Sequence, residues 1–214
     1  MEAVILCGGK ATRLRPYTEE IPKALIPIKG VPILKRQIEQ LLEAGVNKII
    51  LATGFLDKQI VDYIMTIRNH AFTVVFSKES EPLGSAGAVR QAMHHITGNF
   101  LVLNGDILSD MDFKELIKNG TNSITLTRFR CPYGVVKTNG NDVIGFDEKP
   151  MLQNVWVSAG YYYLDKRLEL PTKGSLEYDV FPNLALKTYK HKGYWQPIDT
   201  QKDIDIAEKS DWIE

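Results

Sequence analysis

The sequence predicts a doubly wound α/β fold, in which helices cover both faces of a mostly parallel, mixed sheet and antiparallel strands are added over a ligand pocket. Two observations predict it. The first half alternates short apolar runs with helix-like segments, and the second half crowds strand-like runs around a hairpin turn. A chain of 214 residues can build one sizeable core and is short for two. We therefore expect residues 1–214 to form a single domain.

Four short runs rich in Val, Ile, Leu or Phe predict buried parallel strands. They are residues 3–6, 48–52, 73–76 and 99–103. Helices are expected between them. The first has an apolar stripe at helical spacing and Gly45 at its C-terminal end, where a left-handed cap is common. Its stripe consists of Ile33, Ile38, Leu41 and Leu42. Ile60, Ile64 and Ile67 mark a second helix, and residues 86–96 predict a third.

Beyond residue 106 the pattern changes to closely spaced strands. A short helix is predicted at residues 112–118, followed by strands at 123–129, 134–137, 143–146 and 155–164. Residues 138–141 read Thr-Asn-Gly-Asn, which is typical of a hairpin turn. We expect these antiparallel strands to wall a pocket above the sheet.

Charge and cysteine content exclude several classes of partner. With 26 basic and 26 acidic residues the net charge is zero, so nothing attracts the whole molecule to nucleic acid or to an anionic membrane. Cys7 and Cys131 lack metal-ligand spacing, which favours a reduced protein in which Cys7 packs as an apolar residue. No run has the length of a signal peptide core or a membrane span. The expected location is the cytoplasm.

The N-terminal segment is typical of a strand that leads into an anion-binding loop. The run that ends at Leu6 and Cys7 is followed by Gly8 and Gly9, whose missing Cβ atoms let backbone N–H groups approach an anion. Arg13 and Lys23 follow. A Gly pair before basic residues also occurs in ordinary turns, so the turn alone leaves both readings open. The endings of a P-loop and of the dinucleotide fingerprint are both missing.

This Gly-rich turn, with an Arg after Thr and then a Pro-Lys pair, resembles the signature of the sugar-phosphate nucleotidylyltransferases (nucleotide-sugar pyrophosphorylases). The resemblance extends from residue 3 to about residue 207 through five motifs in the order of that family. It implies a Rossmann-like fold and the transfer of a nucleotidyl group from a nucleoside triphosphate to a sugar 1-phosphate, with release of pyrophosphate. The sugar phosphate would attack the α-phosphorus in line, so that catalysis depends on positioning and charge neutralisation.

Asp106 follows a predicted strand and Gly105, at the sheet edge where Gly8 should also lie. A carboxylate beside phosphates can hold Mg²⁺, although a helix cap is the alternative, for which Ser109 and Asp110 are better placed. The resemblance implies that Asp106 is a metal ligand. It also implies that Arg13 holds the β and γ phosphates and that Lys23 bridges the attacking and transferring phosphates.

The second metal ligand is expected at Asp199. Residues 195–200 read Trp-Gln-Pro-Ile-Asp-Thr, which is similar to glucose-1-phosphate cytidylyltransferases. The commonest pattern of the family instead has Asp two residues after Trp and Gly at the position of Asp199. The alternative is that Asp199 caps a helix through residues 204–208.

The sugar phosphate is expected to meet Glu148 and Lys149 in the sequence Phe-Asp-Glu-Lys-Pro, with the carboxylate on sugar hydroxyls and the ammonium on the phosphate. Such pairs are more often solvated surface, but the resemblance favours a site because a Tyr-Gly-Val-Val segment precedes it there too. Gly134 would then let the sugar lie against the backbone. Ser158 is also an expected contact of the sugar phosphate, and it stands where the family usually has Asn.

The expected nucleotide-binding residues are Leu6, Gly8, Gly9 and Gly84. Gly84 lies in the segment 81–87, which resembles the loop that lies along the nucleotide base in the family. The alternative is that this segment is a plain Pro-Gly helix start. This loop resembles those of guanylyl and uridylyl transferases, whereas the Trp-Gln-Pro segment resembles that of cytidylyl transferases. The base and the sugar are therefore left open.

Ala11 departs from the family, which usually has Gly there. If that position needs a positive φ, strain of order 1 kcal/mol is expected. This leaves one alternative function, a nucleotide-sugar-binding regulatory subunit with weak catalysis, against which Arg13, Lys23 and Asp106 argue together. The hexapeptide repeats of the C-terminal β-helix found in parts of the family do not occur in the sequence. The expected form is a bare catalytic domain, as a monomer or a homodimer.

Overall fold

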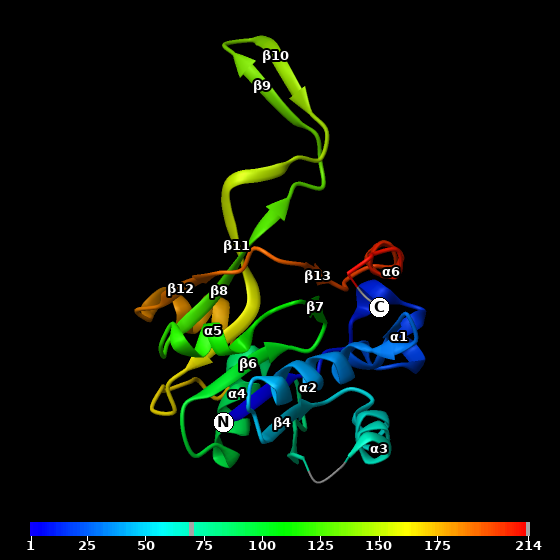
Figure 1. The fold of residues 1–214 in the computed structure, drawn as a ribbon, viewed down its shortest axis with the longest axis vertical. Helices are drawn as coiled ribbons and strands as arrows, with labels where there is room; N and C mark the ends of the chain where they lie inside the picture. The colour runs from blue at the N-terminus through cyan, green and yellow to red at the C-terminus, as the bar shows by residue number, and fades with distance from the viewer. Residues whose placement is uncertain (69–70, 213–214) are drawn as a thin grey trace.

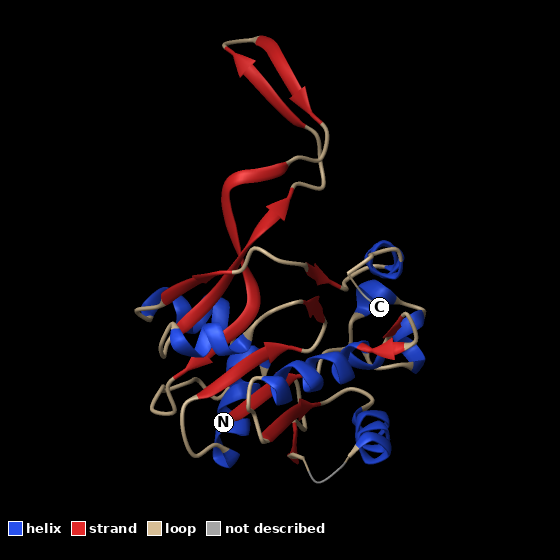
Figure 2. Ribbon diagram, in the orientation of Figure 1, coloured by secondary structure: helices blue, strands red, loops and turns tan. Residues whose placement is uncertain are grey.

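The computed structural model describes residues 1–68 and 71–212. The strands of its main sheet are β1 (Glu2–Leu6), β4 (Lys48–Thr53), β5 (Thr73–Lys78), β6 (Phe100–Asn104), β8 (Ser123–Arg130), β11 (Met151–Leu164) and β12 (Lys187–Lys190). Three strand pairs are separate from it: β2 (Pro27–Ile28) with β3 (Val31–Pro32), β7 (Ile107–Ser109) with β13 (Trp195–Pro197), and β9 (Val135–Asn139) with β10 (Asp142–Asp147). Figure 2 shows these strands in red.

The helices lie between the strands along the chain (Figures 1 and 2). The α-helices are α1 (Tyr17–Glu20), α2 (Ile33–Glu43), α3 (Asp57–Ile67), α4 (Gly84–Ala92), α5 (Phe113–Lys118) and α6 (Gln201–Glu208). Shorter helical turns are η1 (Thr12–Leu14), η2 (Lys23–Leu25), η3 (Met93–His95), the π-helix η4 (Leu176–Val180) and η5 (Phe181–Asn183). The third predicted helix therefore starts at Gly84 and ends as an α-helix at Ala92.

The main sheet has the strand order β12-β8-β11-β6-β1-β4-β5. The four strands β6, β1, β4 and β5 are mutually parallel, and β11 runs antiparallel to both β6 and β8. From β1 the chain adds β4 and β5 on one side and then returns to add β6 on the other. The strand order thus reverses between β1 and β6, which is where ligands bind in open sheets of this type.

Two hydrophobic cores lie on opposite faces of the sheet. Ala3 and Ile5 of β1 belong to the core beneath α2, α3 and α5, whereas Val4 belongs to the core beneath α4 and η4. Alternate side chains of a strand point to opposite faces, so a strand covered on both sides must be apolar throughout. This confirms the doubly wound prediction.

The predicted antiparallel strands are present, but their placement differs from the expectation. β8, β11 and β12 continue the main sheet sideways, and the β9–β10 hairpin projects away from the body (Figure 1). The pairing of β11 with β8 shifts register between Met151 and Trp156, at the base of this projection. Large apolar side chains are exposed on the hairpin and beside it, at Tyr133, Val136, Val143, Ile144 and Phe146.

None of the described helices is both long enough and apolar enough to cross a membrane.

A buried acid, Glu2, lies at the N-terminal end of the central strand β1. The Glu2 carboxylate accepts hydrogen bonds from the backbone N–H groups of Thr97 (2.6 Å) and Gly98 (3.1 Å), and from Lys48 Nζ (3.2 Å). Burial raises the pKa of Glu2, but these hydrogen bonds outweigh it and hold the pKa below its ordinary value of 4.5.

Glu2→Gln is expected to lower the free energy of unfolding at pH 7 by about 1–2 kcal/mol, because the charged acceptor is lost. A lowered folded-state pKa stabilises the fold above the unfolded pKa, and this contribution disappears as the pH falls through the folded pKa. The difference between wild type and variant should therefore shrink in acid below the ordinary pKa. Urea unfolding at neutral and acid pH measures it, and an equal difference at both would contradict this role.

Candidate active site

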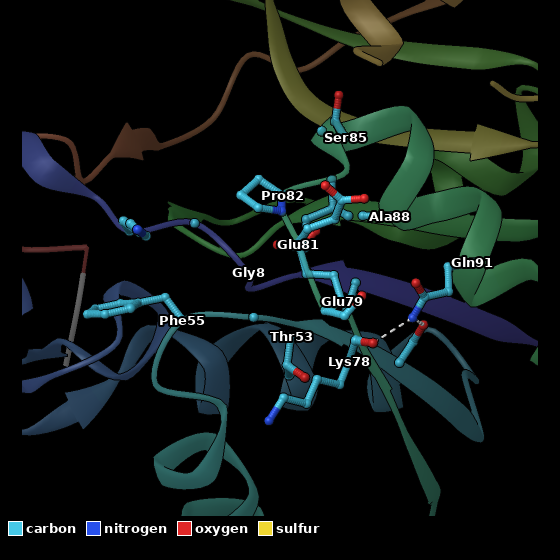
Figure 3. A pocket seen from close by; sticks show the side chains of 18 residues that line it. Gly8, Thr53, Phe55, Lys78, Glu79, Glu81, Pro82, Ser85, Ala88 and Gln91 are labelled. Atoms are coloured by element: carbon cyan, nitrogen blue, oxygen red, sulfur yellow. Dashed lines mark hydrogen bonds between the residues drawn. The ribbon is translucent and has the colours of Figure 1, made fainter. Parts of the chain in front are cut away.

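Two cavities open at the carboxyl ends of the parallel strands and share Leu6 and Gly9. The larger, of about 710 Å³, lies over the ends of β1, β4 and β5 and the start of α4 (Figure 3). The smaller, of about 280 Å³, lies between the ends of β1 and β6. Both cavities therefore lie at the carboxyl edge of the sheet, where the reversal of strand order predicts a ligand site.

The larger cavity contains all four residues that the sequence predicts for nucleotide binding, namely Leu6, Gly8, Gly9 and Gly84. Gly84 is the first residue of α4 and has φ +74°. A Cβ atom there would collide with the carbonyl oxygen of Gly174, so only glycine fits this position. The two readings of this segment are thus compatible, since Gly84 both starts a helix and lines the cavity.

Glu79 lies in the wall of the same cavity and was missed by the sequence analysis, which began this motif at Glu81 (Figure 3). It follows directly on the end of β5. Glu79 Oε1 is so close to the backbone of Gly8 and Gly54 that a Cβ atom on either would approach it to 2.6 or 2.7 Å. Its Oε2 accepts from the backbone N–H of Leu83 at 3.1 Å. Its place three residues after the predicted strand at residues 73–76 was a signal that could have found it.

In the smaller cavity, one ammonium group joins the two predicted metal ligands. Lys23 Nζ lies 2.5 Å from Asp106 Oδ2 and 2.7 Å from Asp199 Oδ1. The Lys23 side chain is 14% exposed, and each carboxylate side chain is 32% exposed. Two acids 93 positions apart in the chain therefore converge on the Lys23 ammonium group. The divalent cation that the sequence analysis expected between them stays a prediction.

The pairing of β7 with β13 explains how Asp199 reaches this place. Asp106 lies in the turn between β6 and β7, and the antiparallel register places Pro197 opposite Ile107. The backbone N–H of Ile198 then donates to the carbonyl oxygen of Asp106 at 2.9 Å. Each strand has only three residues, too short for an alternating pattern to predict, and this ladder brings the two acids together.

Neither acid serves as the helix cap that was its alternative interpretation. α5 is capped by Asp112, whose side chain accepts from the backbone N–H of Lys114; this corrects the expected caps, Ser109 and Asp110. α6 is capped by Thr200, which forms a capping box with Asp203. The carboxylates of Asp106 and Asp199 thus remain directed at Lys23.

Arg13 lies at the mouth of the smaller cavity. Its Nη2 is 2.9 Å from Asp199 Oδ1, and its side chain is 72% exposed. An exposed ion pair contributes little to stability, so Arg13 can leave Asp199 for an anionic ligand at small cost.

Cys7 also lines this cavity. Burial, with the nearby Asp106 charge, raises the pKa of the Cys7 thiol to about 12, so it stays protonated at neutral pH and is no nucleophile.

Ala11 adopts the left-handed conformation that the family's glycine suggested, with φ 46° and ψ 47°. We expect Ala11→Gly to raise the free energy of unfolding by up to about 1 kcal/mol. The relieved left-handed strain of about 1–2 kcal/mol is partly offset by the larger entropy of glycine in the unfolded chain. Urea unfolding measures the change, and a destabilised variant would contradict this account of the loop.

The residues predicted for the sugar phosphate lie apart from these cavities. Gly134 and Glu148 flank the β9–β10 hairpin and lie close together, since a Cβ on Gly134 would approach Glu148 Oε2 to 3.1 Å. Lys149 Nζ pairs with Glu148 Oε1 at 3.1 Å. Ser158 lies on β11 and contacts Tyr162. None of the four is among the residues that line either cavity in the described chain, so their sugar-binding role remains a prediction.

The donor set of the smaller cavity suits a hard divalent cation. Two half-exposed carboxylates already point at one positive charge, and Mg²⁺ is usually held by one or two carboxylates together with substrate phosphates and water. Within residues 1–68 and 71–212, no group of three or more His, Cys, Asp or Glu side chains could hold a metal ion. A cation at Asp106 and Asp199 would therefore need further oxygens from a bound ligand and from water.

Comparison with known proteins agrees with this geometry. The family model described as nucleotidyl transferase matches residues 2–179. The catalytic subunit beta of mannose-1-phosphate guanylyltransferase from Xenopus tropicalis is 34% identical over 227 residues, which cover 95% of this chain and 62% of that protein. The bifunctional protein GlmU of Methanococcus maripaludis is 33% identical, and the match covers 95% of this chain and 53% of GlmU.

The chain thus spans between half and two thirds of the length of these relatives. Among solved structures, HddC from Yersinia pseudotuberculosis superposes with a TM-score of 0.79 at 30% identity, covering 97% of this chain and 98% of HddC. A second HddC structure, in complex with GMP-PN, matches equally well. The family model covers most of the sequence, and residues at the strand ends of this chain line the two cavities. The chain therefore belongs to the nucleotidyl transferase family.

Proposed function

We propose that this chain transfers a guanylyl group from GTP to a sugar 1-phosphate and releases pyrophosphate, with residues 1–214 carrying the catalytic unit. The observation that carries the proposal is the convergence of Asp106 and Asp199 on Lys23 next to the glycine turn. A phosphate oxygen of the acceptor attacks the α-phosphorus in line, the bond to the β-phosphate oxygen breaks, and pyrophosphate leaves. No covalent enzyme intermediate is needed.

The two cavities divide the nucleotide between them. The larger has room for the base and ribose, and the smaller receives the phosphates, whose oxygens meet backbone N–H groups of the Gly8-Gly9 turn. Lys23 neutralises charge on the transferring phosphate. Arg13, released from Asp199, pairs with the departing pyrophosphate, for which a forked guanidinium is suited.

Asp106 and Asp199 would hold Mg²⁺. When bound, this ion neutralises phosphate charge and orients the α-phosphate for attack. The chain's own contribution is to fix both carboxylates by the β7–β13 ladder and to place Lys23 beside them. Charge stabilisation of this kind usually contributes more to the rate of such reactions than any other single effect.

The base preference follows from Glu79. An ionised carboxylate only accepts hydrogen bonds, and guanine is the base whose edge presents two adjacent donors, the ring N1–H and the 2-amino group. Uracil, thymine, cytosine and adenine each place an acceptor beside a single donor there. The guanylyltransferase relatives and the nucleotide complex of HddC support the same choice.

The direct test is a pyrophosphate-release screen. Four triphosphates, GTP, UTP, CTP and dTTP, are each combined with mannose 1-phosphate, glucose 1-phosphate, a heptose 1-phosphate and an amino-sugar 1-phosphate, with Mg²⁺ and with excess chelator. We expect release with GTP and at least one sugar 1-phosphate, and loss of release with chelator. Absence of release in every combination would contradict the proposed function.

A further inference from the structure

A chain of hydrogen bonds links β11 to the start of α4 through Glu177, a residue of η4 that has no role in the proposed reaction. Glu177 Oε1 accepts from the Tyr162 hydroxyl at 3.2 Å. Glu177 Oε2 accepts from the hydroxyls of Ser85 at 3.0 Å and of Ser175 at 2.7 Å. The Tyr162 hydroxyl also lies 3.1 Å from Ser158 Oγ. One carboxylate thus connects Ser158, a predicted sugar contact, with Ser85, which lines the nucleotide cavity.

The direction of these hydrogen bonds follows from the chemistry of the groups. Burial raises the pKa of Tyr162, and its side chain is only 1% exposed, so the phenol keeps its single proton. That proton is donated to Glu177, because an ionised carboxylate cannot donate. Ser158 must then donate its own proton to the Tyr162 oxygen. The Ser158 oxygen is left with lone pairs, one of which accepts from the backbone N–H of Gly160 at 3.3 Å.

Ser158 is exposed, so its other lone pair is open to a ligand while its proton is held inside. A serine in this state can accept a hydrogen bond from a sugar hydroxyl but cannot donate one. The usual Asn of the family can do both. The chain of hydrogen bonds therefore restricts Ser158 to accepting a hydrogen bond from a ligand, whereas a serine without these partners could donate or accept.

Ser85 is held in the same way on the nucleotide side. Its hydroxyl donates to Glu177 and accepts from the backbone N–H of Leu176 at 2.8 Å. The backbone N–H of Ala86 donates to the carbonyl oxygen of Gly174 at 3.0 Å. The segment that carries Glu177 is thereby fixed against the first turn of α4 beside Gly84.

We propose that Glu177 and Tyr162 are positioning residues that fix Ser158 as a hydrogen-bond acceptor for one hydroxyl of the sugar 1-phosphate, and that Glu177 also holds Ser85 against the nucleotide cavity. This inference rests on the proposed function. Two variants should therefore differ in their effects. Tyr162→Phe disturbs only Ser158 on the sugar side, whereas Glu177→Gln disturbs both Ser158 and Ser85 on the nucleotide side.

The experiment measures KM for GTP and for the sugar 1-phosphate found in the screen, together with kcat and Tm. Tyr162→Phe should raise KM for the sugar 1-phosphate about 2- to 10-fold and leave KM for GTP unchanged. Glu177→Gln should raise both values. Tyr163→Phe is the matched control, because Tyr163 is the next residue of β11, packs in the opposite core, and its hydroxyl makes no hydrogen bond within the described chain. It should leave both KM values unchanged.

Deoxyfluoro analogues of the same sugar 1-phosphate test the polarity itself, since fluorine cannot donate a hydrogen bond. At one ring position fluorine should weaken wild type, and the Tyr162→Phe variant, in which Ser158 is free to donate, should lose less from the same replacement. Equal losses in both proteins at every position, or a parallel change in both KM values for Tyr162→Phe, would overturn this inference and leave the proposed function standing. Wild type that turns over no sugar 1-phosphate would overturn both.

Discussion

Asp106→Asn is expected to reduce kcat by about 100-fold or more, because the loss of one charge-stabilising contact in the transition state commonly costs that much. The variant keeps the size of the side chain and removes its charge. The carboxylate that lies 2.5 Å from Lys23 Nζ in wild type is replaced by a neutral amide, and the cation site retains one acid. Asp199→Asn should have a similar effect, since its carboxylate contacts the same ammonium at 2.7 Å.

Pyrophosphate release with saturating GTP and Mg²⁺ measures this effect, and thermal unfolding shows that the fold is retained. Asp112→Asn is the matched control. Asp112 caps α5, and Asn is as good a cap as Asp, so this variant should keep wild-type turnover and stability. If Asp106→Asn and Asp199→Asn also kept wild-type turnover, neither acid would have a catalytic role.

Glu79→Gln is expected to reduce kcat/KM for GTP by about 10- to 100-fold, which corresponds to the loss of a charged hydrogen bond to the base. The Gln side chain offers one acceptor, and its amide donors face the two donors of guanine. Pyrimidine triphosphates, which present an acceptor there, should lose less or gain. The ratio of kcat/KM for GTP to that for UTP is the measurement, and UTP serves as the internal control. An unchanged ratio would exclude Glu79 from base recognition.

Much of the fold could be predicted from the sequence because local pattern and tertiary environment agree. The strand at residues 3–6 is apolar at every position, which only a strand covered on both faces requires, and β1 is indeed buried on both. Gly45 has φ +83° directly after α2 and its C-cap Ala44, as a C-terminal cap should. The doubly wound arrangement then placed Asp106 at the sheet edge near Gly8.

Other features depend on contacts that the sequence does not reveal. Asp199 reaches the site through β13, a strand of three residues, and Glu79 acquires its place from the close approach of Gly8 and Gly54. The hairpin was predicted from its Asn-Gly turn, but the sequence did not predict the register shift between Met151 and Trp156 at its base. Turn chemistry fixes how two strands pair and says nothing about where the pair points.

Binding of Mn²⁺ in the presence of a non-hydrolysable GTP analogue reports the occupancy of the cation site without turnover. Mn²⁺ takes the oxygen ligands that Mg²⁺ takes, and its electron paramagnetic resonance signal distinguishes free from bound ion. We predict one bound ion per chain in wild type and in Asp112→Asn, with affinity at least about 10-fold weaker in Asp106→Asn and Asp199→Asn. Wild-type affinity in either of these last two variants would contradict a cation held jointly by Asp106 and Asp199.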